Sequence, residues 1–262
     1  MKLPKFKPFT TWNPTKLFAH KQCPLRAQLR YALKLCGICF KGSFGFDKPC
    51  DKCKKMPEKS DAQTRGIRLD EAVFKRLSGA EPVDPVTKHP KVLKLIQSVE
   101  HAIQEHAVRV YLKHSISLSP EWKLLPKFTK GPWFWGELDA LMIAKGVAKV
   151  RDWKSGGVNK KTGEPYPNED YEKQLLIYGV ATLCAFPEVQ TASSELVFLD
   201  AKPPYNPVVK GPEVTRKKLP VLQRQLEGEL QPLFSDTIFG PRPGWYCDYC
   251  DYRKDVGGPC KY

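Results

Sequence analysis

Two aspartates and a lysine stand at the ends of neighbouring apolar segments, in the stretches GELDALM (136–142) and VRDWKSG (150–156). Residues two apart in a strand share a face, so Asp152 and Lys154 are expected on one side of the second segment. Asp139 can converge with Asp152 if the two segments pair. Converging carboxylates suit Mg²⁺ or Mn²⁺, which prefer hard oxygen ligands. A solvated ion pair at a strand end is the alternative interpretation.

The chemistry that such a site supports is the hydrolysis of a phosphate ester. The carboxylates would hold the cation, which neutralises the phosphate and lowers the pKa of an attacking water. Lys154 would orient that water or stabilise the charge that develops in the transition state. Two further polar residues, Gln174 and Tyr178, are expected on one face of a following helix because they are four residues apart.

Three short motifs occur in the order G-x-x-D (136–139), D-x-K (152–154) and Q-x-x-x-Y (174–178). In order and spacing they resemble the core of the RecB-type PD-(D/E)XK nucleases, which implies a restriction-endonuclease-like α/β fold and DNA cleavage. The resemblance implies metal ligation by Asp139, Asp152 and the backbone carbonyl of Trp153, action of Lys154 on the nucleophile, and positioning of the DNA or bracing of the site by Gln174 and Tyr178.

Two further acids are candidates for a third metal ligand. The stretch RGIRLDEAVFKRLSG (65–79) is similar to the first helical motif of the family, which carries a histidine near the metal. Asp70 occupies the histidine position here, so a carboxylate would replace the imidazole. Glu121, in the stretch SPEWKLL, is the second candidate. The missing histidine also leaves open a nuclease fold that binds nucleic acid without cutting it.

The chain has nine cysteines, several of them in C-x-x-C pairs, which favours metal ligation in a reducing compartment over disulfide bonds. Four of them form the pattern C-x2-C-x10-C-x2-C, which suits a tetrahedral structural Zn²⁺ site, at Cys36, Cys39, Cys50 and Cys53. An iron ion in a rubredoxin-like site is the alternative, because four thiolates accept either metal. Cys184 lies in an apolar helical segment and is expected to pack in the core.

The remaining cysteines are split between the two ends of the sequence, at Cys23 and at Cys247, Cys250 and Cys260. This arrangement resembles the iron–sulfur subset of RecB-type nucleases, which includes the AddB subunit and the CRISPR-associated adaptation exonucleases. The resemblance implies a [4Fe–4S] cluster that joins these two segments around the nuclease core. A zinc site of Cys23, Cys247, Cys250 and either Cys260 or His20 is the rival interpretation.

The net charge of +15 over 262 residues, together with an aromatic content of 11%, favours a nucleic-acid partner. We expect DNA that is single-stranded or has free ends, since unpaired bases can stack on aromatic side chains such as Trp133, Phe134, Trp135 and Trp153. The longest uncharged apolar segment, residues 174–187, is too short to span a bilayer, and no signal peptide is evident. The sequence therefore indicates a soluble protein of the cytoplasm or another intracellular compartment, with no membrane partner.

The expected order of elements is that of an α/β domain with a mixed central sheet flanked by helices. The expected helices span 13–35 (with a turn at Cys23), 60–79, 89–114, 170–186 and 219–234, and the expected strands span 115–126, 133–144, 146–154 and 193–200. A tight turn at Gly146 would join the second and third strands. Residues 1–11 are expected to form a poorly ordered arm.

The predicted domains are 1–35 (N-terminal arm and helix), 36–55 (four-cysteine zinc module), 56–240 (nuclease core) and 241–262 (C-terminal cluster segment). The sequence contains no P-loop ATPase motif, so we expect an exonuclease that processes DNA ends rather than a helicase-coupled machine. The alternatives are a catalytically inactive DNA-binding metalloprotein and a nuclease subunit of a larger recombination or repair complex, which would bring a protein partner. The sequence does not indicate the oligomeric state.

Overall fold

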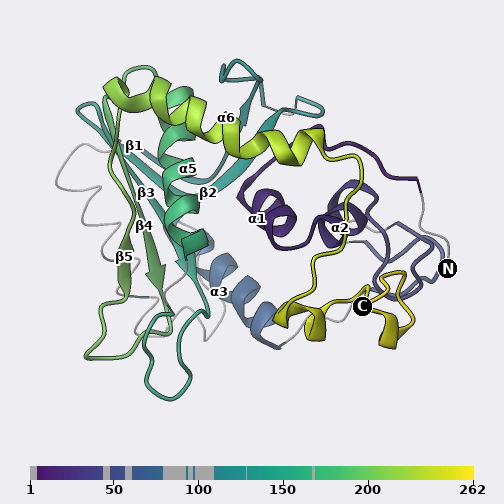
Figure 1. Cartoon of the computed structure of the whole chain (residues 1–262). Coiled ribbons are helices and arrows are strands. Elements are labelled where there is room, and N and C mark those ends of the chain that lie inside the picture. The colour runs from purple at the N-terminus through teal and green to yellow at the C-terminus, as the bar shows by residue number, and fades with distance from the viewer. Residues whose placement is uncertain are drawn as a thin grey trace. The chain divides into compact units, whose positions relative to one another are not determined.

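The computed structural model describes residues 5–43, 48–56, 61–78, 93, 97, 109–127, 129–166 and 169–262, without the side chains of 61–63, 65, 66, 69, 70 and 76. The chain divides into two compact units. The sheet unit comprises Lys59–Gln223, and the cysteine unit comprises Met1–Glu58 together with Arg224–Tyr262. Figure 1 shows the course of the chain through both units.

A six-stranded mixed sheet forms the centre of the sheet unit. Its strands are β1 (Arg109–Leu118), β2 (Phe134–Ala144), β3 (Val147–Lys154), β4 (Thr191–Phe198), β5 (Val208–Lys210) and β6 (Val214–Thr215). The first five are hydrogen-bonded in chain order, and β6 pairs with β4. β1, β2 and β3 form an antiparallel meander, whereas β3 and β4 are parallel. The parallel pair requires a crossover connection, which contains the helix α5 (Glu169–Ala185).

The sheet is buried on both faces, because successive residues of β4 pack into different clusters. Leu196 packs with Leu175 of α5, whereas Val197 packs with Val73 of α3 (Asp61–Leu77). Side chains alternate across a strand, so these two clusters lie on opposite faces of the sheet. Figure 1 shows α5 running across one face of the strands. The predicted α/β fold with a mixed sheet flanked by helices is therefore confirmed.

A two-residue turn at Lys145 and Gly146 joins β2 to β3, where the sequence predicts a tight turn. Both residues have positive φ, 46° and 76°, which is the turn geometry that matches the twist of a hairpin. The register of the hairpin runs as far as Ala140 paired with Arg151. The aspartate next to each of these residues therefore comes to the same end of the hairpin.

The helix predicted over 89–114 is wrong at its C-terminal end, because β1 begins at Arg109. Leu93 and Gln97 are helical, and the other residues of this prediction before Arg109 lie outside the described part of the chain. Pairing with β2 along the whole of β1 outweighs the local helical preference of these residues. The strand predicted over 115–126 is the end of β1 followed by a turn, after which Leu124 bridges back to Leu118.

Two short strands and the N-terminal segment also differ from the predictions. β5 and β6 lie between the expected strand 193–200 and the expected helix 219–234, where no element was predicted because Pro and Gly residues obscure the short extended runs. Residues 1–4 of the expected poorly ordered arm lie outside the described residues, but Phe9 of the arm is buried, and Gln28 Nε2 donates to the Lys7 carbonyl at 2.6 Å. These contacts come from residues distant in sequence, so residues 1–11 alone could not indicate them.

The cysteine unit starts with α1 (Pro14–Gln22), α2 (Pro24–Ala27) and a π-helical turn (Gln28–Ala32). The Asn13 side chain caps α1 by accepting the Lys16 N–H at 2.8 Å. The helical segment breaks at Cys23, before a proline, as the sequence predicts.

The chain returns to the cysteine unit through α6 (Leu219–Ser235), which begins in the sheet unit. Two short 3₁₀ helices follow it, Trp245–Tyr249 and Lys254–Val256. None of the helices among the described residues combines the length and the apolar composition that crossing a lipid bilayer requires.

Candidate active site and metal-binding cysteines

The carboxylate of Asp139 lies on β2, just past the paired stretch of the β2–β3 hairpin. Its Oδ1 atom accepts a hydrogen bond from Lys113 Nζ of β1 at 2.5 Å. Its Oδ2 atom accepts one from the backbone N–H of Trp153 in β3 at 3.0 Å. Three neighbouring strands therefore fix this carboxylate, and the Asp139 side chain is 15% exposed.

Asp152 on β3 is held in a similar way by a lysine and an amide. Lys154 Nζ lies 2.5 Å from its Oδ2 atom, and Gln174 Nε2 of α5 donates to its Oδ1 atom at 3.3 Å. The same Gln174 nitrogen donates to Tyr178 Oη at 3.0 Å, one helical turn further along α5. The side chain of Asp152 is only 7% exposed, so these partners offset the cost of burying it.

Burial and mutual repulsion determine the charge properties of this group. Burial, followed by the charge of Asp152, raises the pKa of Asp139 to about 6, although the hydrogen bonds that Asp139 accepts act in the opposite direction. Burial lowers the pKa of Lys154, but the neighbouring aspartates outweigh it and raise that pKa above its ordinary value. Burial also raises the pKa of Tyr178, so its phenol is neutral at physiological pH.

The donor set of this site fits a hard divalent cation. Asp139 accepts the backbone N–H of the residue next to Asp152, so the two acids are neighbours, and after burial the charge of Asp152 is the next cause that raises the pKa of Asp139. A cation between two such carboxylates relieves the repulsion, and Mg²⁺ and Mn²⁺ prefer carboxylate oxygens as ligands. These two residues could therefore hold the metal that the sequence predicts.

The structure brings together five of the predicted site residues, namely Asp139, Asp152, Lys154, Gln174 and Tyr178. The pairing of β2 with β3 places the first three, and one turn of α5 places the other two. The spacing of the three sequence motifs thus reflects two physical constraints, a hairpin register and a helical repeat.

Of the two candidates for a third acidic ligand, only Glu121 has a described side chain, and it lies away from this group. Glu121 is exposed in the turn after β1 and accepts a hydrogen bond from Ser119 at 2.7 Å. That turn follows the pairing of Leu118 with Phe134, and Phe134 precedes Asp139 by five residues, or roughly 17 Å of strand. Asp70 belongs to α3, but its side chain lies outside the described residues.

The backbone N–H of Trp153 belongs to the site because it donates to Asp139. The Trp153 side chain packs with Val73 and Ala140, on the face of the sheet away from Asp152. The metal-ligating role predicted for its carbonyl stays a prediction. Lys113 is a site residue that the sequence reasoning missed, because the helix predicted over 89–114 included it. Recognising β1 as the partner of β2 would have placed this lysine beside Asp139.

The four-cysteine group has the separation that a single tetrahedral ion requires. The ligand atoms of Cys36, Cys39, Cys50 and Cys53 all lie within 4.8 Å of one another. Cys36 and Cys53 have their Sγ atoms 3.8 Å apart, and those of Cys39 and Cys50 are 3.5 Å apart. A Zn–S bond of about 2.3 Å predicts an edge of about 3.8 Å for a tetrahedron of thiolates. This cluster can therefore bind a metal ion.

Each C-x-x-C pair of this group forms the same turn. The residue after the second cysteine, Phe40 or Lys54, donates its N–H to the carbonyl of the first cysteine at 2.9 Å. Both residues have positive φ, 56° and 53°. Backbone N–H groups of Lys41 and Gly42 lower the pKa of the Cys39 thiol to about 6, whereas burial raises the pKa of its partner Cys50.

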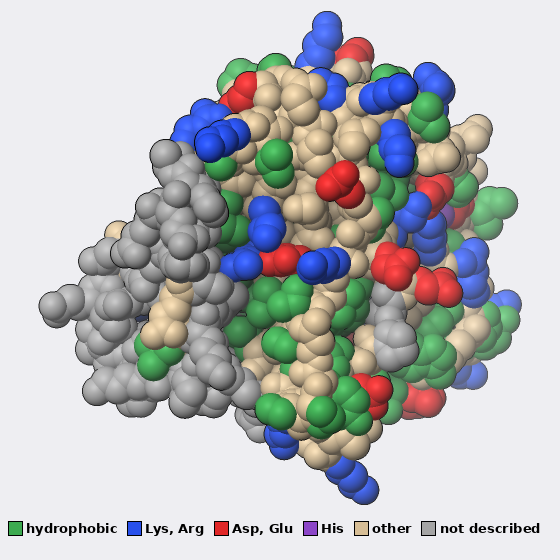
Figure 2. Space-filling view, turned by 90° about the vertical axis from the view of Figure 1, so that its left-hand side faces the viewer, with side chains coloured by type: hydrophobic (Ala, Val, Ile, Leu, Met, Phe, Trp, Pro, Cys, Tyr) green, Lys and Arg blue, Asp and Glu red, His purple; other side chains and the backbone are tan. Residues whose placement is uncertain are grey.

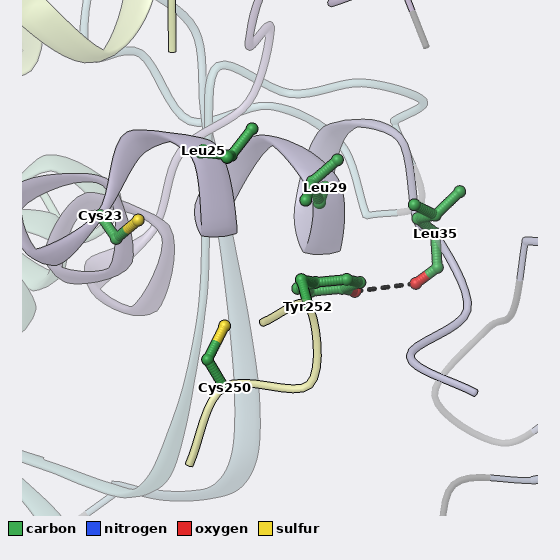
Figure 3. Packing of buried hydrophobic residues seen from close by; sticks show 6 residues of the cluster. All are labelled: Cys23, Leu25, Leu29, Leu35, Cys250 and Tyr252. Carbon is green, nitrogen blue, oxygen red and sulfur yellow. Dashed lines mark hydrogen bonds between the residues drawn. The ribbon is translucent and has the colours of Figure 1, made fainter. Parts of the chain in front are cut away.

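The other predicted cysteine group also comes together, but at a wider separation. One cavity of the cysteine unit is lined by all four of its members, Cys23, Cys247, Cys250 and Cys260. Figure 3 shows the thiols of Cys23 and Cys250 to one side of the Tyr252 ring, whose hydroxyl donates to the Leu35 carbonyl at 2.8 Å. Among the residues that the structure describes, only the four-cysteine group of Cys36 offers three or more ligand atoms within 4.8 Å of one another.

His20, the rival ligand of this second group, has a different partner. Its Nε2 atom lies 2.9 Å from Asp236 Oδ2, and the described residues that line the cysteine cavity do not include it. Its ring also packs edge-on against Phe9 and Phe239. The nine cysteines are all free, so none is held in a disulfide.

The sequence matches a model of the PD-(D/E)XK nuclease superfamily over residues 11–254. The chain belongs to this superfamily. The match includes the strands that carry Asp139 and Asp152 and the helix that carries Gln174, so the superfamily predicted from the three motifs is confirmed. Membership of the iron–sulfur subset stays a prediction.

Three solved structures are similar to this chain at low sequence identity. One, "Crystal structure of SSO0001", is 19% identical and covers 76% of this chain and 82% of its own, with a TM-score of 0.29. The alkaline exonuclease LHK-Exo from Laribacter hongkongensis is 14% identical and covers 70% of this chain and 84% of its own, with a TM-score of 0.29. The complex of LHK-Exo with dAMP is 14% identical and covers 68% of this chain and 82% of its own, with a TM-score of 0.30.

At these scores the three structures add no argument to the superfamily match. The search of curated proteins gave no match to this sequence.

The excess of positive charge is not gathered into one unbroken patch on the face drawn in Figure 2. Lys and Arg side chains are interspersed there with Asp and Glu side chains. A nucleic acid bound to this face would therefore meet separate positive positions with acidic groups between them.

A double-mutant cycle tests the pairing of Asp152 with Lys154. Lys154→Met leaves the Asp152 carboxylate buried without its lysine, and we expect the free energy of unfolding to fall by about 3 kcal/mol. In Asp152→Asn/Lys154→Met the charge is gone as well, so the loss should be much smaller than the sum of the two single changes. Urea denaturation of the four proteins measures these values. Additive effects of the two substitutions would contradict the ion pair.

Proposed function

We propose that this protein is a metal-dependent DNA nuclease that hydrolyses phosphodiester bonds, working as an exonuclease at DNA ends. One observation carries the proposal: Asp139, Asp152, Lys154, Gln174 and Tyr178 come together on the central sheet of a PD-(D/E)XK nuclease superfamily fold. A DNA-binding protein without catalysis would have no need of two adjoining buried carboxylates beside a lysine.

In this proposal Asp139 and Asp152 hold Mg²⁺ or Mn²⁺, with the Trp153 carbonyl as a further ligand and Asp70 as a candidate third acid. When bound, the cation neutralises the charge of the scissile phosphate and lowers the pKa of the attacking water. Glu121 is a weaker candidate than Asp70, because its turn lies five residues or more along the sheet from the site.

Lys154 is the group that acts on the nucleophile. Its ammonium is 2.5 Å from Asp152 and its side chain is 29% exposed, so it can reach a water beside the carboxylates. Its raised pKa keeps it charged, which suits stabilising the negative charge of the transition state. Hydrolysis adds the hydroxyl group of water to phosphorus, breaks the bond to the leaving sugar oxygen and transfers a proton to that oxygen.

Gln174 and Tyr178 act on Asp152 and, in this proposal, on the DNA strand. The Gln174 amide donates to both Asp152 Oδ1 and Tyr178 Oη, so it sets the orientation of the carboxylate. The buried, neutral Tyr178 phenol keeps that amide in place. A metal-binding carboxylate with a fixed orientation needs no rearrangement when substrate binds.

We propose DNA with single-stranded or free ends as the substrate. The net charge of +15 favours a polyanion, and the sequence has no P-loop that would couple the nuclease to a helicase. Trp135 on β2 is 42% exposed and is available to stack on an unpaired base, whereas Phe134 and Trp153 are buried. Of the aromatic residues proposed to contact DNA, Trp135 is therefore the strongest candidate.

The two cysteine groups have different metals in this proposal. Structural Zn²⁺ occupies Cys36, Cys39, Cys50 and Cys53, whose separation suits one tetrahedral ion. A [4Fe–4S] cluster occupies the wider group around Cys23, because a cubane of iron and sulfide holds its four thiolates further apart than one ion does. Zinc at the wider group is the rival, and it would require the cysteines to move closer together.

Free thiols and a metal cluster both favour an intracellular compartment, which we propose as the location. A role in DNA repair or recombination, with a protein partner, would fit an end-processing nuclease. The second candidate function is a catalytically inactive DNA-binding metalloprotein or a nuclease subunit that requires its complex. Asp70, which stands where the superfamily's helical motif has a histidine, is the observation that favours this second candidate.

Cleavage assays separate these functions. We expect the wild-type protein to degrade linear but not circular DNA with Mg²⁺ or Mn²⁺ and to stop when EDTA is added. Asp152→Ala and Lys154→Ala should each reduce the rate by about a hundredfold or more, because each removes a group that stabilises charge in the transition state. Lys149→Ala is the matched control, since Lys149 is an exposed lysine of β3 outside the site.

Two results would count against this account in different ways. Retained DNA binding without cleavage under all of these conditions would favour the binding protein. Cleavage of circular DNA would contradict the exonuclease mode alone.

Metal analysis tests the two cysteine groups independently. We expect anaerobically purified wild-type protein to be brown and to contain four iron atoms and one zinc per chain. Cys50→Ser should lose the zinc and keep the colour, whereas Cys250→Ser should lose the colour and keep the zinc. A colourless protein with two zinc ions per chain would replace the cluster by the rival zinc site.

A further inference from the structure

Lys113 is a second lysine at the candidate active site, and it comes from a strand that carries none of the three motifs. Its Nζ atom lies 2.5 Å from Asp139 Oδ1 and 5.6 Å from the centre of the Trp153 ring. The Lys113 side chain is 22% exposed. In this one position the ammonium contacts both a carboxylate and the face of an indole.

The backbone at Lys113 is strained in a way that its neighbours are not. Its φ is +49°, although Leu112 and His114 pair regularly with Ala140 and Leu138 on either side. A left-handed conformation costs a residue with a side chain about 1–2 kcal/mol and is rare inside a strand. Unfavourable backbone dihedral angles of this kind persist where the surrounding structure imposes them, and they are frequent at functional sites.

Lys113 gives Asp139 the ammonium partner that Lys154 gives Asp152. Asp139 and Asp152 each have one ammonium group at 2.5 Å, from Lys113 and Lys154 respectively. A divalent cation at the two carboxylates would give the group an excess of positive charge. One ammonium must then leave its carboxylate or meet a new anion.

Lys113 can leave its carboxylate more easily than Lys154 when a cation binds. Lys154 is attracted by both aspartates, and Asp152 is the more deeply buried of the two. Lys113 stands on the outer strand of the meander, on a flexible four-carbon stem. The anion that enters the site with substrate is the DNA phosphate.

We propose that Lys113 is a second active-site lysine, which neutralises Asp139 until a divalent cation is bound and then contacts a non-bridging oxygen of the substrate phosphate. The inference rests on the proposed nuclease function. It has two separable consequences. Lys113 weakens cation binding in the absence of DNA, and it accelerates cleavage once DNA and cation are both bound.

The test compares Lys113→Met with the wild type and with Lys149→Met, which removes an exposed lysine of β3 outside the site. Mn²⁺ binding is measured without DNA by electron paramagnetic resonance, at about pH 8, well above the pKa of Asp139. We expect Lys113→Met to bind Mn²⁺ on the order of tenfold more tightly, because a competing positive charge is gone.

Cleavage of linear DNA is measured with the same proteins at saturating Mn²⁺. We expect Lys113→Met to cleave on the order of tenfold more slowly, because the phosphate loses a cationic contact. Lys149→Met should match the wild type in both measurements. Lys113→Arg, which keeps the charge, should retain wild-type Mn²⁺ affinity and most of the cleavage rate.

The opposite signs of the two effects distinguish this role from a structural one. Weaker Mn²⁺ binding together with slower cleavage in Lys113→Met would mean that the residue only supports the fold and would overturn the proposal. Unchanged cleavage would remove the phosphate contact and overturn it as well. If the wild-type protein cleaves no DNA, the proposed function fails, and the Mn²⁺ measurement still decides whether Lys113 competes for Asp139.

Discussion

Two carboxylates held side by side with little exposure to solvent are the constraint on which the rest of this structure depends. Burial disfavours the charged form of Asp139, and repulsion by Asp152 adds to that cost. Four donors offset it, one ammonium and one N–H for each acid, from Lys113, Trp153, Lys154 and Gln174. The donors come from β1, β3 and α5, so these elements must be in place before the acids can be.

The topology of the sheet explains how so few residues build the site. β3 is antiparallel to β2 and parallel to β4, and the parallel pairing requires a crossover through α5. The β2–β3 hairpin places Asp139 and Asp152 on adjacent strands, and the crossover connection places α5 over the same strands. Gln174 therefore reaches Asp152 from above the sheet, and Trp153 N–H reaches Asp139 within it.

Those parts of the site that depend on local geometry could be predicted from the sequence. A Gly-containing turn between two apolar segments predicts the hairpin, and residues four apart on a helix predict that Gln174 and Tyr178 are in contact. The four-cysteine spacing predicts a tetrahedral metal site because two short turns can form almost independently of the rest of the chain. In each case the information lies within a few residues.

The parts that depend on distant partners could not be predicted. Lys113 lies in a segment whose pattern continues that of a helix, and only pairing with β2 makes it a strand. Phe40 and Lys54 adopt positive φ without being glycine, so nothing in their residue type indicates the repeated turn of the cysteine pairs. Asp70 is the reverse case. The sequence motif predicts this residue as a metal ligand, but its side chain lies outside the described residues.

Titration with paramagnetic Mn²⁺, followed by nuclear magnetic resonance, tests most directly whether the two aspartates form the cation site. We expect the backbone N–H signal of Trp153 and the side-chain amide signal of Gln174 to broaden at substoichiometric Mn²⁺, since these groups donate to the two carboxylates. The same signals should stay sharp in Asp139→Asn/Asp152→Asn. Broadening that is unchanged in this variant, or that first affects signals elsewhere in the chain, would mean that the two aspartates do not form the cation site.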